Sequence, residues 1–293
     1  MRTLLLLTAL VLMPLEAFTE ERMLRLGISA PLTGDLAEYG VAVRNGIELA
    51  RSEKAPSLEN VDFVFEDNRY DAAESVSAFR KLRDINHVDA IFNWGEPTLG
   101  AIAPLAAKNR FPVLAMSLDA VPAEKNDFVQ LINNPADEYA STMMRYLRSK
   151  GAKRIGIVQT EDPFLESMVA GLRKHADTGE SIEVFARFAP GDNDFKTQIT
   201  RLKPASFDAI GVYLFSGQVS AFFRQAETQG LKGLFFGTDF FESRTEISQA
   251  GPAIVGAVYP NVRVPKTFLD QYAKRYGNDA QIAYAYNAYV FAK

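Results

Sequence analysis

The chain has 293 residues, of which 47% are hydrophobic and 23% charged, and its formal net charge is −4. This composition predicts a folded core, and a length near 300 favours two domains because single cores stop growing at about 250–300 residues. The mild acidic charge and the lack of a basic block argue against nucleic-acid binding. Cysteine is absent and the two histidines form no cluster, so we expect no metal, no cofactor and no disulfide.

The first 17 residues, MRTLLLLTALVLMPLEA, have the layout of a secretory signal peptide. Arg2 precedes an apolar run over Thr3–Met13, and Ala17 is a small residue suited to cleavage. The run is shorter than the roughly 20 apolar residues that a transmembrane helix needs. We therefore expect residues 1–17 to be removed and the mature protein to be periplasmic. A buried N-terminal helix is the alternative.

After this segment, short apolar runs alternate with longer amphipathic ones. The strand-like runs are Leu24–Ser29, Val61–Glu66, Asp89–Asn93, Pro112–Met116, Arg154–Gln159, Ile182–Phe188, Ala209–Leu214, Gly233–Gly237 and Ile254–Tyr259. Most are apolar on both faces, which is typical of parallel strands that helices cover on both sides. The helix-like runs between them include Tyr39–Ser52, Ala72–Asp84, Glu138–Lys150, Val219–Gln229 and Ala280–Lys293. Asp71 and Asp162 are predicted to cap helix starts.

The alternation of strand and helix predicts an α/β fold of right-handed βαβ units. The series restarts at Arg154–Gln159, which predicts two Rossmann-like lobes with parallel sheets joined by a hinge. With chain crossings near Leu131–Pro135 and Tyr259–Val264, lobe 1 comprises residues 23–132 plus 260–293 and lobe 2 comprises residues 133–259. The last helix-like run has no stop signal, so we expect the chain to be truncated at its C-terminus.

Sequence signals for catalysis are few. The sequence contains no G-x-S-x-G elbow and no Walker A loop, and no G-x-G-x-x-G follows the first strand. His87 and His175 lie at helix ends and are interpreted as surface residues. We therefore expect a protein that is not an enzyme. An α/β enzyme that uses carboxylates such as Asp67 and Asp239 is the alternative.

The loops at the carboxyl ends of the predicted strands carry the candidate ligand-binding residues. Ligands of open parallel sheets bind at this edge, beside helix N-termini. The loops APLTGDLAEYG, NWGEPTLG, TEDPF, LFSGQ and TDFF supply Tyr39, Trp94, Thr98, Phe164, Phe215 and Asp239. Free backbone N–H groups at the helix start near Thr98 would suit a carboxylate. Core packing, capping or turn formation is the alternative for each residue.

Several long segments resemble one family. The segment LRLGISAPLTGDLAEYGVAVRNGIELA resembles the opening of the branched-chain amino-acid-type substrate-binding proteins of ABC transporters. So do VFEDNRYDAAESVSAFRKL, IAPLAAKNRFPVLAMS and GDNDFKTQITRLKPASFDAIGVYLFSGQVSAFFRQAETQGL, and together they cover nearly the whole chain after the signal. The resemblance implies the type I periplasmic-binding fold and delivery of a small polar organic molecule to a membrane permease. It also implies a chain that continues several dozen residues past Lys293.

The resemblance also implies ligand contacts in both lobes. In lobe 1 these are Tyr39, Thr98, Ser117 and Asp119, and in lobe 2 they are Phe164, Phe215 (or Ser216) and Asp239. The turn at Thr98 would hold a ligand carboxylate, and Asp239 would pair with an ammonium. The turn WGEPT is poor in hydroxyls and Phe164 has none, which makes the site more apolar and suits a less ordinary amino acid or an aromatic or aliphatic acid.

Together these features predict a monomeric extracytoplasmic protein that captures an amino acid or a related small organic acid for uptake by an ABC transporter. The lobes would close on the ligand, because only the closed state lets it touch both. A ligand-sensing receptor of the same fold is the alternative. Neighbouring genes for a permease and ATPases would separate the two.

Overall fold

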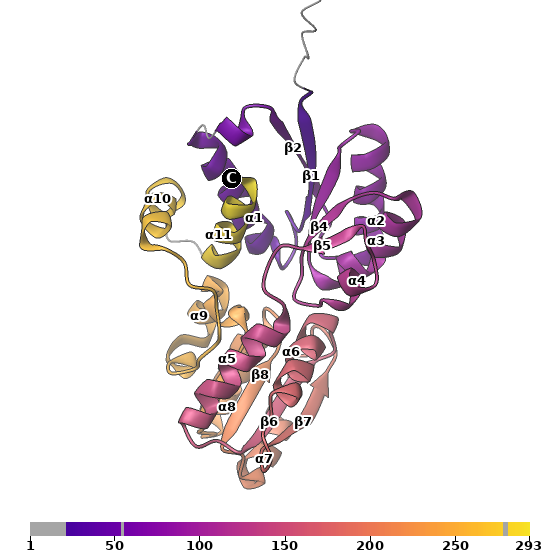
Figure 1. Ribbon diagram of the computed structural model, residues 1–293. Coiled ribbons are helices and arrows are strands. Elements are labelled where there is room, and N and C mark those ends of the chain that lie inside the picture. The colour runs from indigo at the N-terminus through magenta and orange to yellow at the C-terminus, as the bar shows by residue number, and fades with distance from the viewer. Residues whose placement is uncertain (1–21, 54–55, 278–280) are drawn as a thin grey trace, which may run out of the picture.

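The computed structural model describes residues 22–53, 56–277 and 281–293, and the predicted signal peptide lies outside these ranges. Two separate parallel sheets, each flanked by helices, stack along the long axis of the molecule (Figure 1). The predicted α/β fold with two parallel sheets is confirmed.

The first sheet has the strand order β2-β1-β3-β4-β5. Its strands are β1 (Leu24–Ala30), β2 (Val61–Asp67), β3 (Ala90–Trp94), β4 (Val113–Met116) and β5 (Val129–Leu131). Helices α2 (Ala72–Arg80) and α3 (Glu96–Asn109) pack together on one side of it, and α1 (Ala37–Ser52) packs with α11 (Ile282–Ala292) on the other (Figure 1). A π-helical turn (Lys81–Ile85) extends α2, and the short helix α4 spans Val121–Glu124.

The second sheet has the order β7-β6-β8-β9. Its strands are β6 (Arg154–Thr160), β7 (Ser181–Phe188), β8 (Ala209–Tyr213) and β9 (Leu234–Gly237). Helix α5 (Ala136–Ser149) packs against α6 (Pro163–Lys174), and α7 (Lys196–Ala205) packs against α8 (Gln218–Thr228). The 3-10 turn Asp239–Glu242 leads from β9 to α9 (Arg244–Ala250), and a second 3-10 turn spans Gly251–Ile254.

Most predicted elements form with ends shifted by a residue or two, but Ile254–Tyr259 is not a strand. Among the described residues, that segment makes only an isolated bridge from Val258 to Phe236 beside β9. Gly256 in the left-handed region (φ +92°) bends the chain just before that bridge. Strand β5 was missed because three residues are too few to show a pattern.

Both predicted aspartate caps are confirmed. The Asp71 carboxylate accepts hydrogen bonds from the backbone N–H groups of Ala73 and Glu74 at the start of α2. Asp162 accepts from Phe164 and Leu165 at the start of α6. Each cap satisfies donors that the first turn of a helix leaves unpaired, so these helix starts are fixed at the strand ends.

The chain passes between the two sheets twice within the described residues. Residues 132–135 lead from β5 to α5, and residues 255–265 lead from the second sheet to α10 (Lys266–Tyr276). Helices α10 and α11 then pack on α1, beside the first sheet (Figure 1). The C-terminal part of the chain therefore belongs spatially with its beginning.

Helices α1 and α11 approach each other closely at Gly46. A Cβ atom added to Gly46 would overlap the backbone carbonyl of Ala285 on α11. Small residues on both helices, including Ala42, Ala50 and Ala288, allow this approach, and all three are buried. Tyr284, which precedes Ala285, depends on this packing for its position.

We expect Gly46→Ala to destabilise the protein by about 1–3 kcal/mol, because the added methyl group overpacks the contact between α1 and α11. Urea denaturation measures the change in the free energy of unfolding. Gly100→Ala is the control, since a Cβ at Gly100 in α3 meets no atom within 4 Å. That substitution should stabilise the protein by up to about 1 kcal/mol. Equal stability of the Gly46 variant and the parent would contradict the close approach.

Candidate ligand-binding cleft

The two lobes meet at a cleft that is almost closed. Two adjoining cavities lie there, and each leaves about 20 Å³ for the centres of water molecules, enough for roughly one water. They share part of their walls, namely Leu118, Asn133, Phe164, Asp239 and Tyr284. A ligand larger than a water therefore requires the lobes to move apart for it to enter.

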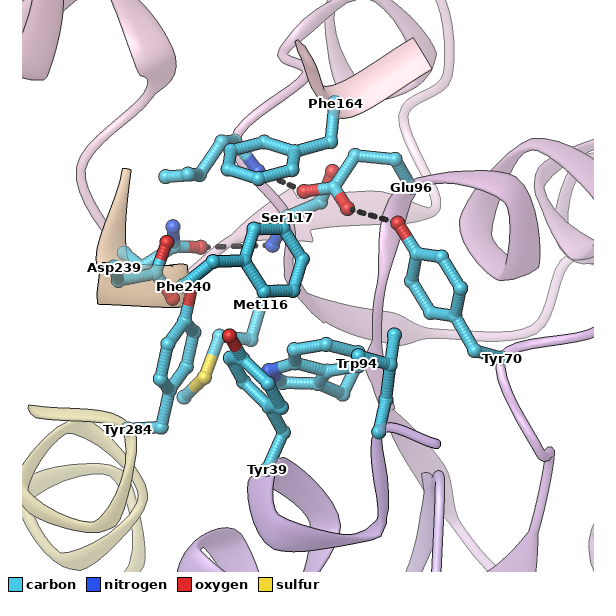
Figure 2. Close-up of a pocket in the computed structure, with 13 residues that line it drawn as sticks. Tyr39, Tyr70, Trp94, Glu96, Met116, Ser117, Phe164, Asp239, Phe240 and Tyr284 are labelled. Carbon is cyan, nitrogen blue, oxygen red and sulfur yellow. Dashed lines mark hydrogen bonds between the residues drawn. The ribbon is translucent and has the colours of Figure 1, made fainter. Parts of the chain in front are cut away.

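The cleft lies where the carboxyl ends of both sets of strands face each other. From the first lobe, Tyr70 follows β2, Trp94 ends β3 and Glu96 begins α3. From the second, Phe164 lies in the first turn of α6 and Asp239 follows β9. Figure 2 shows these side chains converging on one space. This is the edge at which parallel sheets bind ligands.

Tyr39 is the centre of an aromatic cluster. Its ring centroid lies 5.0 Å from that of Trp94, 5.3 Å from Tyr284 and 5.8 Å from Phe240. The hydroxyl of Tyr39 and the indole N–H of Trp94 are buried and form no hydrogen bond within 3.5 Å among the described residues, although the Asp239 carboxylate is close enough to the Tyr39 hydroxyl to interact with it. A buried polar group without a partner costs about 1–3 kcal/mol, so both groups are candidates for bonding to a ligand.

The carboxylate of Glu96 lies at the carboxyl ends of strands β2, β3 and β4. One oxygen accepts a 2.8 Å hydrogen bond from the backbone N–H of Leu118, and the other accepts a 3.1 Å bond from the Tyr70 hydroxyl (Figure 2). Burial raises the pKa of Glu96 to about 7, and the nearby Asp162 carboxylate adds to the shift. The group is therefore close to half-charged at neutral pH.

A second carboxylate, that of Asp239, lies beside the phenol of Tyr284 (Figure 2). Asp239 is only 9% exposed. Burial raises its pKa to about 6, while the phenols of Tyr284 and Tyr39 partly offset the shift. Burial and the charge of Asp239 together raise the pKa of Glu242 to about 7.

No lysine or arginine is among the described residues that line either cavity. Burial also raises the pKa of Asp162, to about 6, on the second lobe. Acidic groups of both lobes thus face the same small space without a basic partner in its walls. The cleft is an acceptor-rich, aromatic-walled site.

Five of the residues predicted from the sequence line the first cavity: Tyr39, Trp94, Ser117, Phe164 and Asp239. The predicted Thr98 is fully buried behind the wall instead. Its hydroxyl lies 2.7 Å from the carbonyl oxygen of Trp94 and accepts a 3.0 Å bond from Asn93. Thr98 therefore holds the end of β3 and does not face the cavity.

Two further predicted residues lie at the margins. Asp119 caps the backbone N–H of Val121 and lines a separate open groove that also contains Arg187. Phe215 packs its ring 5.3 Å from Phe240 and 6.3 Å from Tyr70, and it lines an adjacent open groove that shares Tyr70 with the first cavity.

Several residues that line the first cavity were not predicted from the sequence: Tyr70, Glu96, Asn133, Phe240 and Tyr284. Glu96 lies in the turn WGEPT, where the shortage of hydroxyls is the more visible sequence feature and a single carboxylate carries no distinct signal. Tyr70 has a positive φ of 58° in the loop after β2. Tyrosine rarely adopts this left-handed conformation, so the sequence does not predict where its side chain points. Tyr284 comes from a helix that carries no local signal for a site.

Of the two carboxylates named for the enzymatic alternative, Asp239 lines the cleft, whereas Asp67 has a structural role. Asp67 accepts hydrogen bonds from the Leu32 backbone and the Thr33 hydroxyl, and its pKa is lowered because these bonds outweigh the effect of its burial. His87 is exposed, and His175 lies 3.1 Å from Asp137 on the surface of the second lobe. The described residues contain no group of three metal-ligating side chains, and none of their helices is long and apolar enough to cross a membrane.

Residues 23–293 match the family model of periplasmic binding proteins. The chain belongs to this family. Its resemblance to the branched-chain amino-acid type is also confirmed by curated relatives. The Leu/Ile/Val-binding protein homolog 2 of Brucella abortus (strain 2308) is 23% identical, with 98% of this chain and 79% of the relative aligned. BraC3, a Leu/Ile/Val-binding protein of Rhizobium johnstonii, is 28% identical over 80% of this chain and 66% of its own length.

Solved structures agree with this assignment. The leucine-binding protein LivK of Thermotoga maritima superposes with a TM-score of 0.81 at 25% identity, covering 91% of this chain and 81% of its own. A Rhodopseudomonas palustris solute-binding protein in complex with benzoate superposes with a TM-score of 0.78 at 18% identity, covering 92% and 78%. The second likeness supports the type I periplasmic-binding fold alone.

The raised pKa of Glu96 predicts how stability depends on pH. The folded chain binds the Glu96 proton more tightly than the unfolded chain does. The contribution of this group to folding stability is therefore fully present below about pH 4.5 and is lost as pH rises through about 7. Glu96→Gln removes the titration while keeping an acceptor for Leu118. The free energy of unfolding of the variant, relative to that of the parent, should therefore be about 1–3 kcal/mol more favourable at pH 8 than at pH 5. Parallel urea-unfolding curves at both pH values would show that Glu96 does not titrate in this way.

Proposed function

We propose that this chain is the solute-binding component of an ABC uptake system. It captures an amino acid or a related small organic molecule between its lobes, delivers it to a membrane permease, and does not change it chemically. The single observation that carries the proposal is the cavity between the facing strand ends, where the Tyr39 hydroxyl and the Trp94 N–H are buried without partners. Relatives and structural neighbours named as leucine-binding or Leu/Ile/Val-binding proteins support it.

The proposed lobes are residues 23–132 plus 260–293 and residues 133–259. Two separate segments connect them, so closure is a rotation about a double crossing and not a local loop movement. Ligand first meets Tyr39 and Trp94 on the first lobe. Closure then adds Phe164 and Asp239 from the second. Because only the closed state offers both sets of contacts, the ligand shifts the population toward it.

The proposed site of action is the periplasm, after removal of residues 1–17, with the protein acting as a monomer. The partner is the ABC-transporter permease, which would recognise the closed arrangement of the two lobes. No chemical step is required, since the ligand's higher affinity for the closed state is enough to shift the population toward that state.

Binding to the native chain should raise its melting temperature by mass action. A thermal-shift screen against amino acids, amines, amides and small carboxylates finds the ligand, and chromatography of the recovered solute tests whether it is unchanged. Turnover of the solute would overturn the proposal in favour of an enzyme. Absence of any shift across the panel at millimolar concentrations would overturn solute capture itself.

Tyr39→Phe gives a sharper test of the cavity. Removing a buried hydroxyl without a partner should raise the melting temperature of the unliganded protein, and removing an acceptor should weaken ligand binding about 2- to 10-fold. Isothermal titration calorimetry and thermal denaturation measure the two effects. Tyr146→Phe, on α5 and away from both cavities, is the control and should change neither. A Tyr39→Phe variant with unchanged affinity would show that this hydroxyl does not contact the ligand.

A further inference from the structure

Two backbone donors beside the cavity are already used by the protein. The N–H of Ser117 donates to the side-chain oxygen of Asn133 at 2.9 Å, and the N–H of Leu118 donates to Glu96 at 2.8 Å. Helix α3 begins at Glu96, and its next residue, Pro97, has no N–H group. A helix start and a strand end of this kind ordinarily receive an anion. Here the carboxylate of Glu96 takes that place.

The charge of the walls favours the opposite sign of ligand. Glu96 and Asp239 line the first cavity, and no basic side chain lines it within the described chain. Asp162 and Glu242 add negative charge to the same region, since they act on the carboxyls of Glu96 and Asp239 or are acted on by them. Where water is largely excluded, negative charges in the cavity walls repel an anion and attract a cation more strongly than they would in bulk water.

The aromatic cluster supplies a second, independent indication. The rings of Trp94, Tyr284 and Phe240 pack around Tyr39 at centroid distances of 5.0 to 5.8 Å, in tilted or edge-to-face arrangements. Aromatic faces attract ammonium groups held within about 6 Å of the ring centroid. The Tyr39 hydroxyl, on a residue that is 1% exposed, points into this space without a partner and can accept a hydrogen bond (Figure 2).

We propose that the solute is a small organic cation, an ammonium compound without a free carboxylate, held between the Tyr39 cluster and the carboxylates of Glu96 and Asp239. This inference rests on the proposed function and specifies its ligand class. An α-amino acid would place its carboxylate against Glu96, whereas an amine would not. Aromatic and aliphatic acids are disfavoured for the same reason.

The test uses two sets of ligands that share one side chain and differ only in their charged groups. The first set is 3-methylbutylamine, leucine and 4-methylpentanoate, and the second is 2-phenylethylamine, phenylalanine and 3-phenylpropanoate. Calorimetry with the purified mature chain at pH 7.5 should show at least one amine binding 10-fold or more tightly than its amino acid, with no binding of the acids. An amino acid or acid that binds as tightly as its amine overturns the inference and leaves solute capture intact. Absence of binding by every solute in this panel and in the wider thermal-shift screen overturns both.

Variants at Glu96 test its role as the substitute for a ligand carboxylate. Glu96→Gln keeps the acceptor for Leu118 but removes the charge, so amine affinity should fall about 10-fold. Glu96→Ala frees the Leu118 N–H, so the preference for amine over amino acid should shrink or reverse. Glu227→Gln, on the exposed face of α8, is the matched control and should leave the preference unchanged. Circular dichroism verifies that each variant folds. If the ratio of amine affinity to amino-acid affinity is unchanged in both Glu96 variants, Glu96 does not take the place of a ligand carboxylate.

Discussion

The carboxylate of Glu96 holds the binding face of the first lobe together. It begins α3 directly after β3, accepts the N–H of Leu118 after β4, and accepts the hydroxyl of Tyr70 after β2. Three strand ends are thereby fixed to one side chain. The Tyr70 ring then packs 5.4 Å from Trp94, which continues the contact into the aromatic cluster. A buried carboxylate is costly unless it is hydrogen-bonded, so the loop geometry and the charge of the site have a single origin.

The same carboxylate connects the charge of the cleft with the movement of the lobes. Glu96 belongs to the first lobe, while Asp162 and Asp239 belong to the second, and burial raises the pKa of all three. Bringing like charges into a space of low polarity opposes closure. A ligand that neutralises these charges removes the repulsion. Its preference for the closed state over the open state is then greater than its direct contacts alone would give. If the lobes close on the ligand as proposed, charge couples ligand binding to that closure.

The sequence predicted those features that depend on local pattern. Strands buried on both faces, the caps at Asp71 and Asp162, and the location of the cleft at the strand ends follow from patterns within a few residues. Other features depend on tertiary structure. Tyr284 reaches the cavity only because α11 packs on α1. Thr98 lies in the expected turn, but its hydroxyl bonds to the backbone of its own loop, and no sequence pattern distinguishes that use from ligand binding.

A fold shared with proteins that bind leucine or benzoate does not determine the ligand of this one, because selectivity resides in the loops that the strand ends carry. In this chain the Glu96 carboxylate lies at the start of α3, and the next residue, Pro97, has no N–H group to offer a ligand. The sheet beneath them needs no change, since Thr98 and Asn93 hold the end of β3 from behind. If the cleft takes a cation as proposed, the side chains at its strand ends set the sign of charge that it accepts, while the two-lobed scaffold beneath them stays the same.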